Sequence, residues 1–153
     1  VRPGGPGTPR LVAFFRSRDY DWVYRSDSGD DGRTWSEPRR QRMPSNNSGI
    51  QACVLREDGA LVLVFNNPPE ERPADRFPLS VALSEDGGET WPWVRDLQGL
   101  EDPGEYSYPA VLQGSDGDIH VAYTYKRQTV RYARITRGWI KAGGSEGRFK
   151  GDR

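Results

Sequence analysis

Several residue types are scarce in this 153-residue chain, and each scarcity narrows what the protein can do. One cysteine, Cys53, excludes an internal disulfide, and its apolar neighbours predict a buried, unreactive thiol. One cysteine and one histidine, His120, do not make a set of zinc ligands, so we expect no metal. We expect His120 to be a packed or surface residue. The sequence has no P-loop and no dinucleotide fingerprint, so we expect no cofactor.

Neither charge nor hydropathy points to a polyanion or a membrane. The 22 Lys and Arg residues balance 22 Asp and Glu residues, which indicates no nucleic-acid partner and no membrane surface. No apolar run approaches the ~20 residues of a membrane-spanning helix. The opening residues 1–7 lack the apolar segment of a signal peptide. Because the chain does not begin with methionine, we expect an incomplete N-terminus, and the compartment stays unknown.

Turn-forming residues are abundant. The chain has 18 glycines and 12 prolines, about a fifth of its length, against an average of roughly 12%. Apolar residues form short runs, as in 11–15 and 60–65, or alternate with polar residues, as in 119–125. No segment shows the 3.6-residue period of a helix. The pattern predicts short strands separated by turns.

One eight-residue motif occurs twice, and we call each copy an octad. Residues 28–35 and 84–91 share S-x-D-x-G-x-T-W, and their tryptophans stand 56 positions apart, which indicates a repeated structural unit. Glycine permits positive φ, and an aspartate accepts hydrogen bonds from N–H groups that follow it, so the motif predicts a tight turn. An EF-hand calcium loop would need a D-x-D-x-D-G frame and a closing glutamate, which are missing. We therefore assign a structural role to Ser28, Asp30, Gly32, Thr34 and Trp35, and to Ser84, Asp86, Gly88, Thr90 and Trp91.

The predicted strands, one of which covers residues 34–41 after the first octad, fall into groups of three, four and three. This pattern predicts an all-β fold, a β-propeller of four-stranded antiparallel blades. About three blades would occupy residues 1–142, followed by a flexible tail over 143–153, and the sequence implies little order from Trp139 onward. Three blades cannot close a ring, because propellers typically have 4–8. We expect part of a larger propeller, or else self-association of copies through open blade edges.

The octads resemble the Asp-box, and the chain is similar to the C-terminal half of the sialidase-like BNR-repeat family. The similarity runs from about Leu11 to Arg134. Besides the octads, it rests on the segments F-R-S-R (15–18), N-S-G-I (47–50) and G-E-Y-S-Y-P-A (104–110). It implies a six-bladed propeller of which this chain holds about three blades. In that family the Asp-box joins the two outer strands of a blade, away from the substrate.

The resemblance also implies a catalytic tyrosine. Sialidases attack the sugar with a tyrosine, which needs a neighbouring carboxylate because its ordinary pKa is about 10. Tyr106 matches the family's Tyr-Ser motif and is the predicted nucleophile; an aromatic residue of the core is the alternative. Tyr108 shares its face in a regular strand and could replace it. Glu105 would face the opposite side, so we do not expect it to be the activating base.

Arginines of this family bind the substrate carboxylate, and a guanidinium can do so with two parallel hydrogen bonds. Arg76 matches one of them in the frame R-x-x-L-x-V-x-L-S before the second octad; an exposed loop arginine is the alternative. Where a second is expected, the chain has Trp22 and Val23, and Arg16 is our choice nearby. Asn66 is predicted to bind sugar hydroxyls or form a turn. The family's first arginine, its aspartate acid/base and the glutamate partner of the tyrosine have no match.

These expectations describe a sialidase-like exo-glycoside hydrolase that cleaves terminal, acidic sugars with net retention, and whose partner is a carbohydrate. Two alternatives stay open: a non-catalytic carbohydrate-binding propeller, and an inactive structural fragment that needs a partner. Propellers that act on other polysaccharides, including rhamnose-containing ones, look similar at this level.

Overall fold

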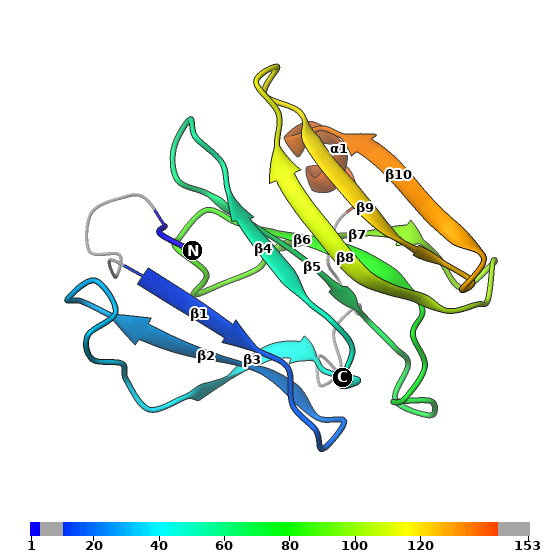
Figure 1. Cartoon of the computed structure of the whole chain (residues 1–153), viewed down its shortest axis with the longest axis horizontal. Helices are drawn as coiled ribbons and strands as arrows, with labels where there is room; N and C mark the ends of the chain where they lie inside the picture. Colours follow the sequence, from blue (N-terminus) through cyan, green and yellow to red (C-terminus); the bar gives the residue numbers. More distant parts are fainter. Residues whose placement is uncertain (4–10, 144–153) are drawn as a thin grey trace.

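The computed structural model describes residues 1–3 and 11–143 (Figure 1). Within these ranges the chain forms strands and one short helix. The predicted tail over 143–153 lies outside the described residues except for Gly143. The elements are β1 (Leu11–Phe15), β2 (Trp22–Ser28), β3 (Arg39–Pro44), β4 (Gln51–Val54), β5 (Leu61–Asn66), β6 (Leu79–Ser84), β7 (Trp93–Gln98), β8 (Tyr106–Gln113), β9 (Ile119–Tyr125), β10 (Thr129–Ile135) and α1 (Arg137–Lys141).

The strands form three separate antiparallel sheets, as predicted. The first sheet has the order β1-β2-β3, the central sheet β4-β5-β6-β7 and the third sheet β10-β9-β8. Each strand pairs with its neighbour in sequence, so each sheet is a meander like a propeller blade. Only the central sheet has the predicted four strands within the described residues. The three sheets do not close a ring, in agreement with the prediction of about three blades.

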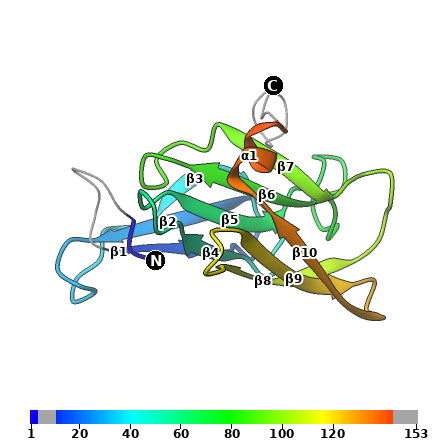
Figure 2. The same ribbon diagram turned by 90° about the horizontal axis from the view of Figure 1, so that it is seen from above.

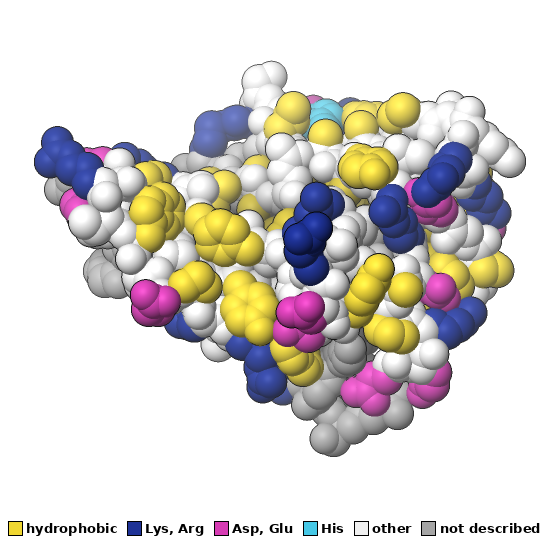
Figure 3. All heavy atoms as spheres, turned by 60° about the horizontal axis from the view of Figure 1, so that its bottom comes forward, with side chains coloured by type: hydrophobic (Ala, Val, Ile, Leu, Met, Phe, Trp, Pro, Cys, Tyr) yellow, Lys and Arg dark blue, Asp and Glu magenta, His cyan; other side chains and the backbone are white. Residues whose placement is uncertain are grey.

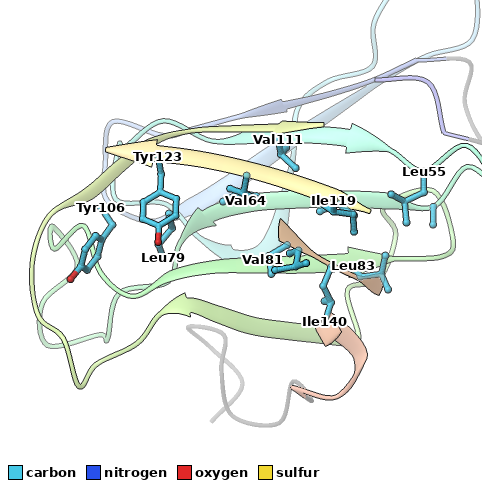
Figure 4. Close-up of a cluster of buried hydrophobic side chains, with 14 of the residues drawn as sticks. Leu55, Val64, Leu79, Val81, Leu83, Tyr106, Val111, Ile119, Tyr123 and Ile140 are labelled. Carbon is cyan, nitrogen blue, oxygen red and sulfur yellow. The ribbon is translucent and has the colours of Figure 1, made fainter. Parts of the chain in front are cut away.

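Two apolar clusters join the sheets across the two faces of the central sheet. Successive side chains of β5 and β6 point to opposite faces of the central sheet. Both strands are buried along their whole length because each of these faces is covered. Val64, Val81 and Leu83 face the third sheet (Figure 4), whereas Leu61 and Leu63 face the first sheet. Each such side chain contributes roughly 1.5–3 kcal/mol when it is fully buried. The central sheet therefore holds the other two in place.

The octads form tight turns, as predicted, between β2 and β3 and between β6 and β7. In the first, Asp30 Oδ1 accepts hydrogen bonds from the N–H groups of Arg33 and Thr34 at 3.1 and 2.9 Å, and Oδ2 accepts one from the Thr34 hydroxyl at 2.7 Å. These bonds, mainly those of Thr34, lower the pKa of Asp30 to about 2. In the second octad, Asp86 accepts the same set of bonds from Glu89 and Thr90.

The two octad tryptophans differ in burial. Trp91 is 7% exposed and packs edge-on against Phe14 of the first sheet, with ring centroids 5.7 Å apart. Trp35 is 44% exposed, and its ring N–H donates to the Gly32 carbonyl at 3.1 Å. Only the second tryptophan serves as the buried anchor of two sheets, because the first has no neighbouring sheet on its side among the described residues.

The strand predicted after the first octad starts later than expected. The sequence placed it at residues 34–41, whereas β3 spans Arg39–Pro44. Thr34 is held in the turn by Asp30, and Pro38 has no N–H to donate to a sheet. The Ser36 N–H between them still donates to the Asp27 carbonyl of β2 at 2.9 Å, but regular strand pairing begins only at Arg39.

Helix α1 corrects the prediction of no helix and of little order after Trp139. The Thr136 hydroxyl caps it by accepting from the Trp139 N–H at 3.1 Å, and Ile140 is fully buried against the core. Figure 2 shows α1 beside β6 and β7. With five residues and one buried side chain, the helix is too short to show a 3.6-residue period in the sequence.

The connections divide between two ends of the sheets. The octads and the β4–β5 and β8–β9 turns lie at one end, which we call the octad end. The β1–β2, β3–β4, β5–β6, β7–β8 and β9–β10 connections lie at the opposite end, because consecutive strands are antiparallel. All predicted site residues fall at or near this opposite end, away from the octads.

Candidate functional site

Hydrogen bonds link the connections at the opposite end into one surface. Arg16 Nη1 donates to the Asn47 carbonyl at 3.3 Å, which joins the β1–β2 and β3–β4 connections. The Asn46 side chain donates to the Asp75 carbonyl at 2.8 Å in the β5–β6 loop. The Tyr106 N–H donates to the Arg76 carbonyl at 3.0 Å, which carries the connection to the start of β8. Residues from all three sheets therefore reach the same region.

Arg76 is held in a defined position at this surface. Its Nη1 lies 3.1 Å from Glu105 Oε1, and its guanidinium lies over the Tyr108 ring at 5.4 Å from the centroid. The first contact is within the ordinary range of an N–H···O hydrogen bond, and the second is within that of a cation–π interaction. The structure therefore brings together two residues that the sequence predicted to bind substrate, Arg76 and Tyr108.

Glu105 connects Arg76 to a second arginine. Its Oε2 lies 2.5 Å from Nε of Arg127 in the β9–β10 turn, and the Ser107 hydroxyl donates to Oε1 at 3.3 Å. Burial alone would raise the pKa of Glu105, but the hydrogen bond from Arg127 and the charges of Arg127 and Arg76 outweigh it and lower the pKa. Glu105 is therefore a carboxylate near neutral pH and is not a proton donor there.

Tyr108 presents its ring to solvent. It is 63% exposed and has φ of 50°, in a bulge where the β8–β9 register shifts between Ser107 and Ala110. Positive φ is unfavourable for a residue with a large side chain and is often found at functional sites. Gly49 lies directly behind: a Cβ there would come within 3.4 Å of the Tyr108 Cα. In a regular strand Tyr108 would share a face with Tyr106. Because of the bulge, Tyr108 is exposed whereas Tyr106 is buried.

Tyr106 has a different environment from Tyr108. Its side chain is 0% exposed and packs against Tyr123 and Tyr125, with centroid distances of 6.4 and 5.4 Å. Figure 4 shows it at one end of the buried cluster, with its hydroxyl directed away from the centre. The hydroxyl donates to the Asp102 carbonyl at 2.7 Å. Burial, followed by the hydrogen bond and negative charge of Asp102, raises the pKa of Tyr106 to about 12.

Two further predicted residues lie near the cluster without joining it. The Asn66 amide donates to the Tyr106 carbonyl at 2.9 Å, and the whole residue is buried. It therefore ties β5 to β8, and its contact with a sugar stays a prediction. Among the described residues, no hydrogen bond or ion pair joins Arg16 to Arg76 or Glu105, and its guanidinium bonds the Asn47 carbonyl instead. Its role as the second carboxylate-binding arginine also stays a prediction.

Sequence reasoning did not predict that Glu105 and Arg127 contact each other at this surface. We set Glu105 aside as a base for Tyr106, and its contacts are indeed with the two arginines instead of that hydroxyl. Arg127 follows Lys126 in a turn where both residues have positive φ, and no local motif marks it. The available signal was the Glu105–Tyr106 segment of the resemblance, which placed a carboxylate at the site.

The face seen in Figure 3 is chemically mixed. Hydrophobic side chains alternate with Lys, Arg, Asp and Glu, so no continuous field of one charge covers it. Among residues 1–3 and 11–143, no group of three or more His, Cys, Asp or Glu side chains could hold a metal ion. Burial raises the pKa of Cys53 to about 11. No helix in the same ranges has the length and apolar character to cross a membrane.

Comparisons with known proteins agree with this architecture. Residues 5–121 match the family model described as the BNR repeat-like domain. No curated protein matches the chain. The solved structures similar to it include a leech intramolecular trans-sialidase complexed with 2,7-anhydro-Neu5Ac (TM-score 0.65, 14% identity, 86% of this chain and 22% of that chain). They also include the K499G mutant of NanB sialidase from Streptococcus pneumoniae (0.68, 17%, 84% and 22%).

A third similar structure is the intramolecular trans-sialidase from Ruminococcus gnavus in complex with oseltamivir carboxylate (TM-score 0.59, 16% identity, 89% of this chain and 34% of that chain). The chain thus spans 22 to 34% of the length of these three structures. At these identities the likeness shows the fold, that of part of a sialidase propeller.

Proposed function

Because the chain belongs to the BNR repeat-like domain family, we propose that it supplies the acidic-sugar-binding part of a sialidase-like exo-glycoside hydrolase. The enzyme would cleave terminal acidic sugars with net retention. One observation carries this proposal: Arg76 is held by Glu105 beside the exposed ring of Tyr108, at the end of the sheets opposite the octads.

The arrangement suits a sugar that bears a carboxylate. One nitrogen of Arg76 contacts Glu105, which leaves other N–H groups of the guanidinium able to donate to a ligand oxygen. A planar guanidinium that is already oriented loses less side-chain entropy when it binds. The Tyr108 ring offers an apolar surface for the C–H groups of a sugar ring.

In the proposed reaction, Tyr106 is the nucleophile. Its oxygen would bond to the anomeric carbon while the glycosidic bond breaks, and water would then displace the tyrosine, so that two inversions give retention. The phenol must first lose its proton, which a pKa of about 12 opposes near neutral pH. The hydroxyl would therefore have to exchange the Asp102 carbonyl for a base. The sequence offers no match for that base or for the acid that protonates the leaving group.

A non-catalytic carbohydrate-binding propeller is the second candidate. The observation that favours it is the buried Tyr106, whose hydroxyl is already engaged by Asp102. Binding by Arg76 and Tyr108 requires no change at Tyr106. A structural fragment that associates through open strand edges is the remaining alternative, and its test is given in the Discussion.

Hydrolysis and binding, measured on one panel of sugars, separate the two candidates. The longest natural polypeptide that contains this sequence is assayed with sialosides, glucuronides, galacturonides, rhamnosides and neutral galactosides. The proposal predicts release of the acidic sugar with its anomeric configuration retained, as seen by NMR at early times. Binding of acidic sugars without any product would support the non-catalytic candidate. Cleavage of rhamnosides alone would reject an acidic-sugar site.

A further inference from the structure

A hollow adjoins the Arg76–Glu105 pair on the side of the third sheet. Its volume is about 570 Å³, within the range of about 300–1,000 Å³ found for small-molecule sites. The lining includes Glu105, Tyr108, Thr124, Arg127, Gln128 and Thr129. Glu105 and Tyr108 thus belong both to the hollow and to the cluster around Arg76.

Arg127 is one of the residues that line this hollow, and most of its guanidinium is exposed. Its side chain is 73% exposed, and Nε lies 2.5 Å from Glu105 Oε2. Its two terminal nitrogens have no hydrogen-bond or ion-pair partner among the described residues. The backbone has φ of 56°, so a tight turn fixes where the side chain leaves the chain.

The side chains that contact Glu105 leave a net positive charge, which one bound anion would neutralise. Arg76 binds one carboxylate oxygen and Arg127 the other, so two guanidinium groups share one carboxylate and the cluster has a net charge of +1. A single ligand carboxylate would neutralise it. Because Glu105 holds each arginine by one nitrogen, the remaining N–H groups can bind the ligand without breaking these pairs.

We propose that Arg127 is a second acid-binding residue of the site, where it acts with Arg76 on the carboxylate of one acidic sugar unit. This inference rests on the function proposed above and replaces Arg16 in that role. The sugar ring would lie against Tyr108, and its hydroxyl groups would meet Thr124, Gln128 and Thr129. Glu105 is the positioning residue that orients both guanidinium groups.

The test is a calorimetric titration of the chain with N-acetylneuraminic acid and with its methyl ester, which keeps the shape and removes the charge. Arg127→Gln is expected to weaken binding of the acid by about 10- to 100-fold, the range for a charge-assisted hydrogen bond. Binding of the ester should change little. Arg127→Lys should restore only part of the affinity, because an ammonium cannot form the same planar pair.

Arg134→Gln is the matched control. Arg134 is also an exposed arginine of the third sheet, pairs with Asp116 and Asp118, and lies near the octad end. Its loss should leave the affinity unchanged. Because both side chains lie at the surface, neither replacement should unfold the chain, and circular dichroism of each variant checks that the sheets are intact.

The outcomes separate this inference from the proposed function. If Arg76→Gln abolishes binding of the acid and Arg127→Gln leaves it unchanged, Arg127 is not part of the site, and the proposed function stands. If both variants bind like the unchanged chain, or if the unchanged chain binds no acidic sugar on a panel that includes glucuronate, both ideas are overturned. An equal loss with Arg134→Gln would reduce the effect to general surface charge and overturn the role of Arg127.

Discussion

At the scale of single residues, the same strand carries two tyrosines with opposite surroundings. Tyr106 and Tyr108 are two positions apart, yet one is buried with a raised pKa and the other is exposed over a glycine. The sequence singled out both tyrosines and Arg76 as candidate site residues, and their roles stay predictions. It could not predict the bulge at Tyr108, because a bulge depends on the pairing of β8 with β9. For the same reason it missed the approach of Arg127 to Glu105.

Replacement of Tyr106 by phenylalanine distinguishes its contribution to stability from its proposed role as the nucleophile. Tyr106→Phe removes the hydrogen bond to Asp102, which should cost about 0.5–1.5 kcal/mol of unfolding free energy in urea. In the longest natural polypeptide with this sequence, the variant should lose glycoside hydrolysis and still bind acidic sugars. Full hydrolysis by Tyr106→Phe would exclude Tyr106 as the nucleophile.

Protonation of Glu105 should weaken the binding of acidic sugars at low pH. Its pKa is lowered, so it stays a carboxylate until the pH falls below the ordinary glutamate value of about 4.3. When it is protonated, Arg76 and Arg127 lose their shared anchor. Glu105→Gln should therefore weaken binding at pH 7, measured by the same titration. Unchanged affinity would show that the two arginines need no anchor.

At the scale of elements, strand prediction succeeded where side chains alternate or are wholly apolar, as in β5, β6 and β9. In these strands the order of apolar and polar residues reflects which side chains are buried, so the sequence alone shows the pattern. The octads were also predicted, because their turn is built from hydrogen bonds among neighbouring residues. The late start of β3 was missed because the pattern alone did not reveal that Asp30 holds Thr34 in the turn. Helix α1 was missed because it depends on the packing of Ile140 against a distant part of the core.

The second octad should contribute measurably to stability. Asp86→Ala removes bonds to the Ser84 hydroxyl, two N–H groups and the Thr90 hydroxyl, and should lower the unfolding free energy by on the order of 2 kcal/mol. Urea unfolding measures this, with the exposed Asp19→Ala as control. Equal effects of the two variants would show that the turn does not depend on Asp86.

Both octad aspartates also predict how stability falls in acid. Their pKa values are lowered on folding, so their contribution is fully present above the unfolded value of about 3.9. For Asp30 it is lost as the pH falls through about 2. The melting temperature should therefore drop between about pH 4 and pH 2, and less steeply in Asp30→Asn. An identical slope in this variant would contradict that assignment.

Helix α1 provides a test of packing that the sequence did not suggest. Ile140 is fully buried, and Ile140→Ala should cost about 2–5 kcal/mol in urea unfolding. Val130→Ala, on an exposed position of β10, should cost little. A cost near zero for Ile140→Ala would mean that α1 does not pack on the core in solution.

At the scale of the whole molecule, the chain forms three separate sheets, and β3 and β10 are edge strands of the first and third sheets. β3 carries Arg39, Arg40 and Arg42, charges that discourage pairing with another strand. β10 has Val130 and Tyr132 exposed, and no strand pairs with its outer edge among the described residues. We therefore expect copies of the chain to associate through β10.

Sedimentation velocity tests this expectation. The chain should form a concentration-dependent dimer, and the double variant Val130→Lys, Tyr132→Lys should be monomeric, because charged side chains disfavour edge pairing. Leu112→Lys, on β8 of the same sheet and away from that edge, is the control. A monomer at all concentrations would show that the open edge does not drive association.

The most direct test of the central claim is whether the chain distinguishes an acidic sugar by its charge through Arg76. The measurement is a calorimetric titration of the unchanged chain and of Arg76→Gln with N-acetylneuraminic acid, glucuronate and their methyl esters. We predict that the unchanged chain binds at least one acid more tightly than its ester, and that Arg76→Gln removes this difference. Equal affinity for acid and ester, or a preference that survives Arg76→Gln, would contradict an acidic-sugar site at Arg76.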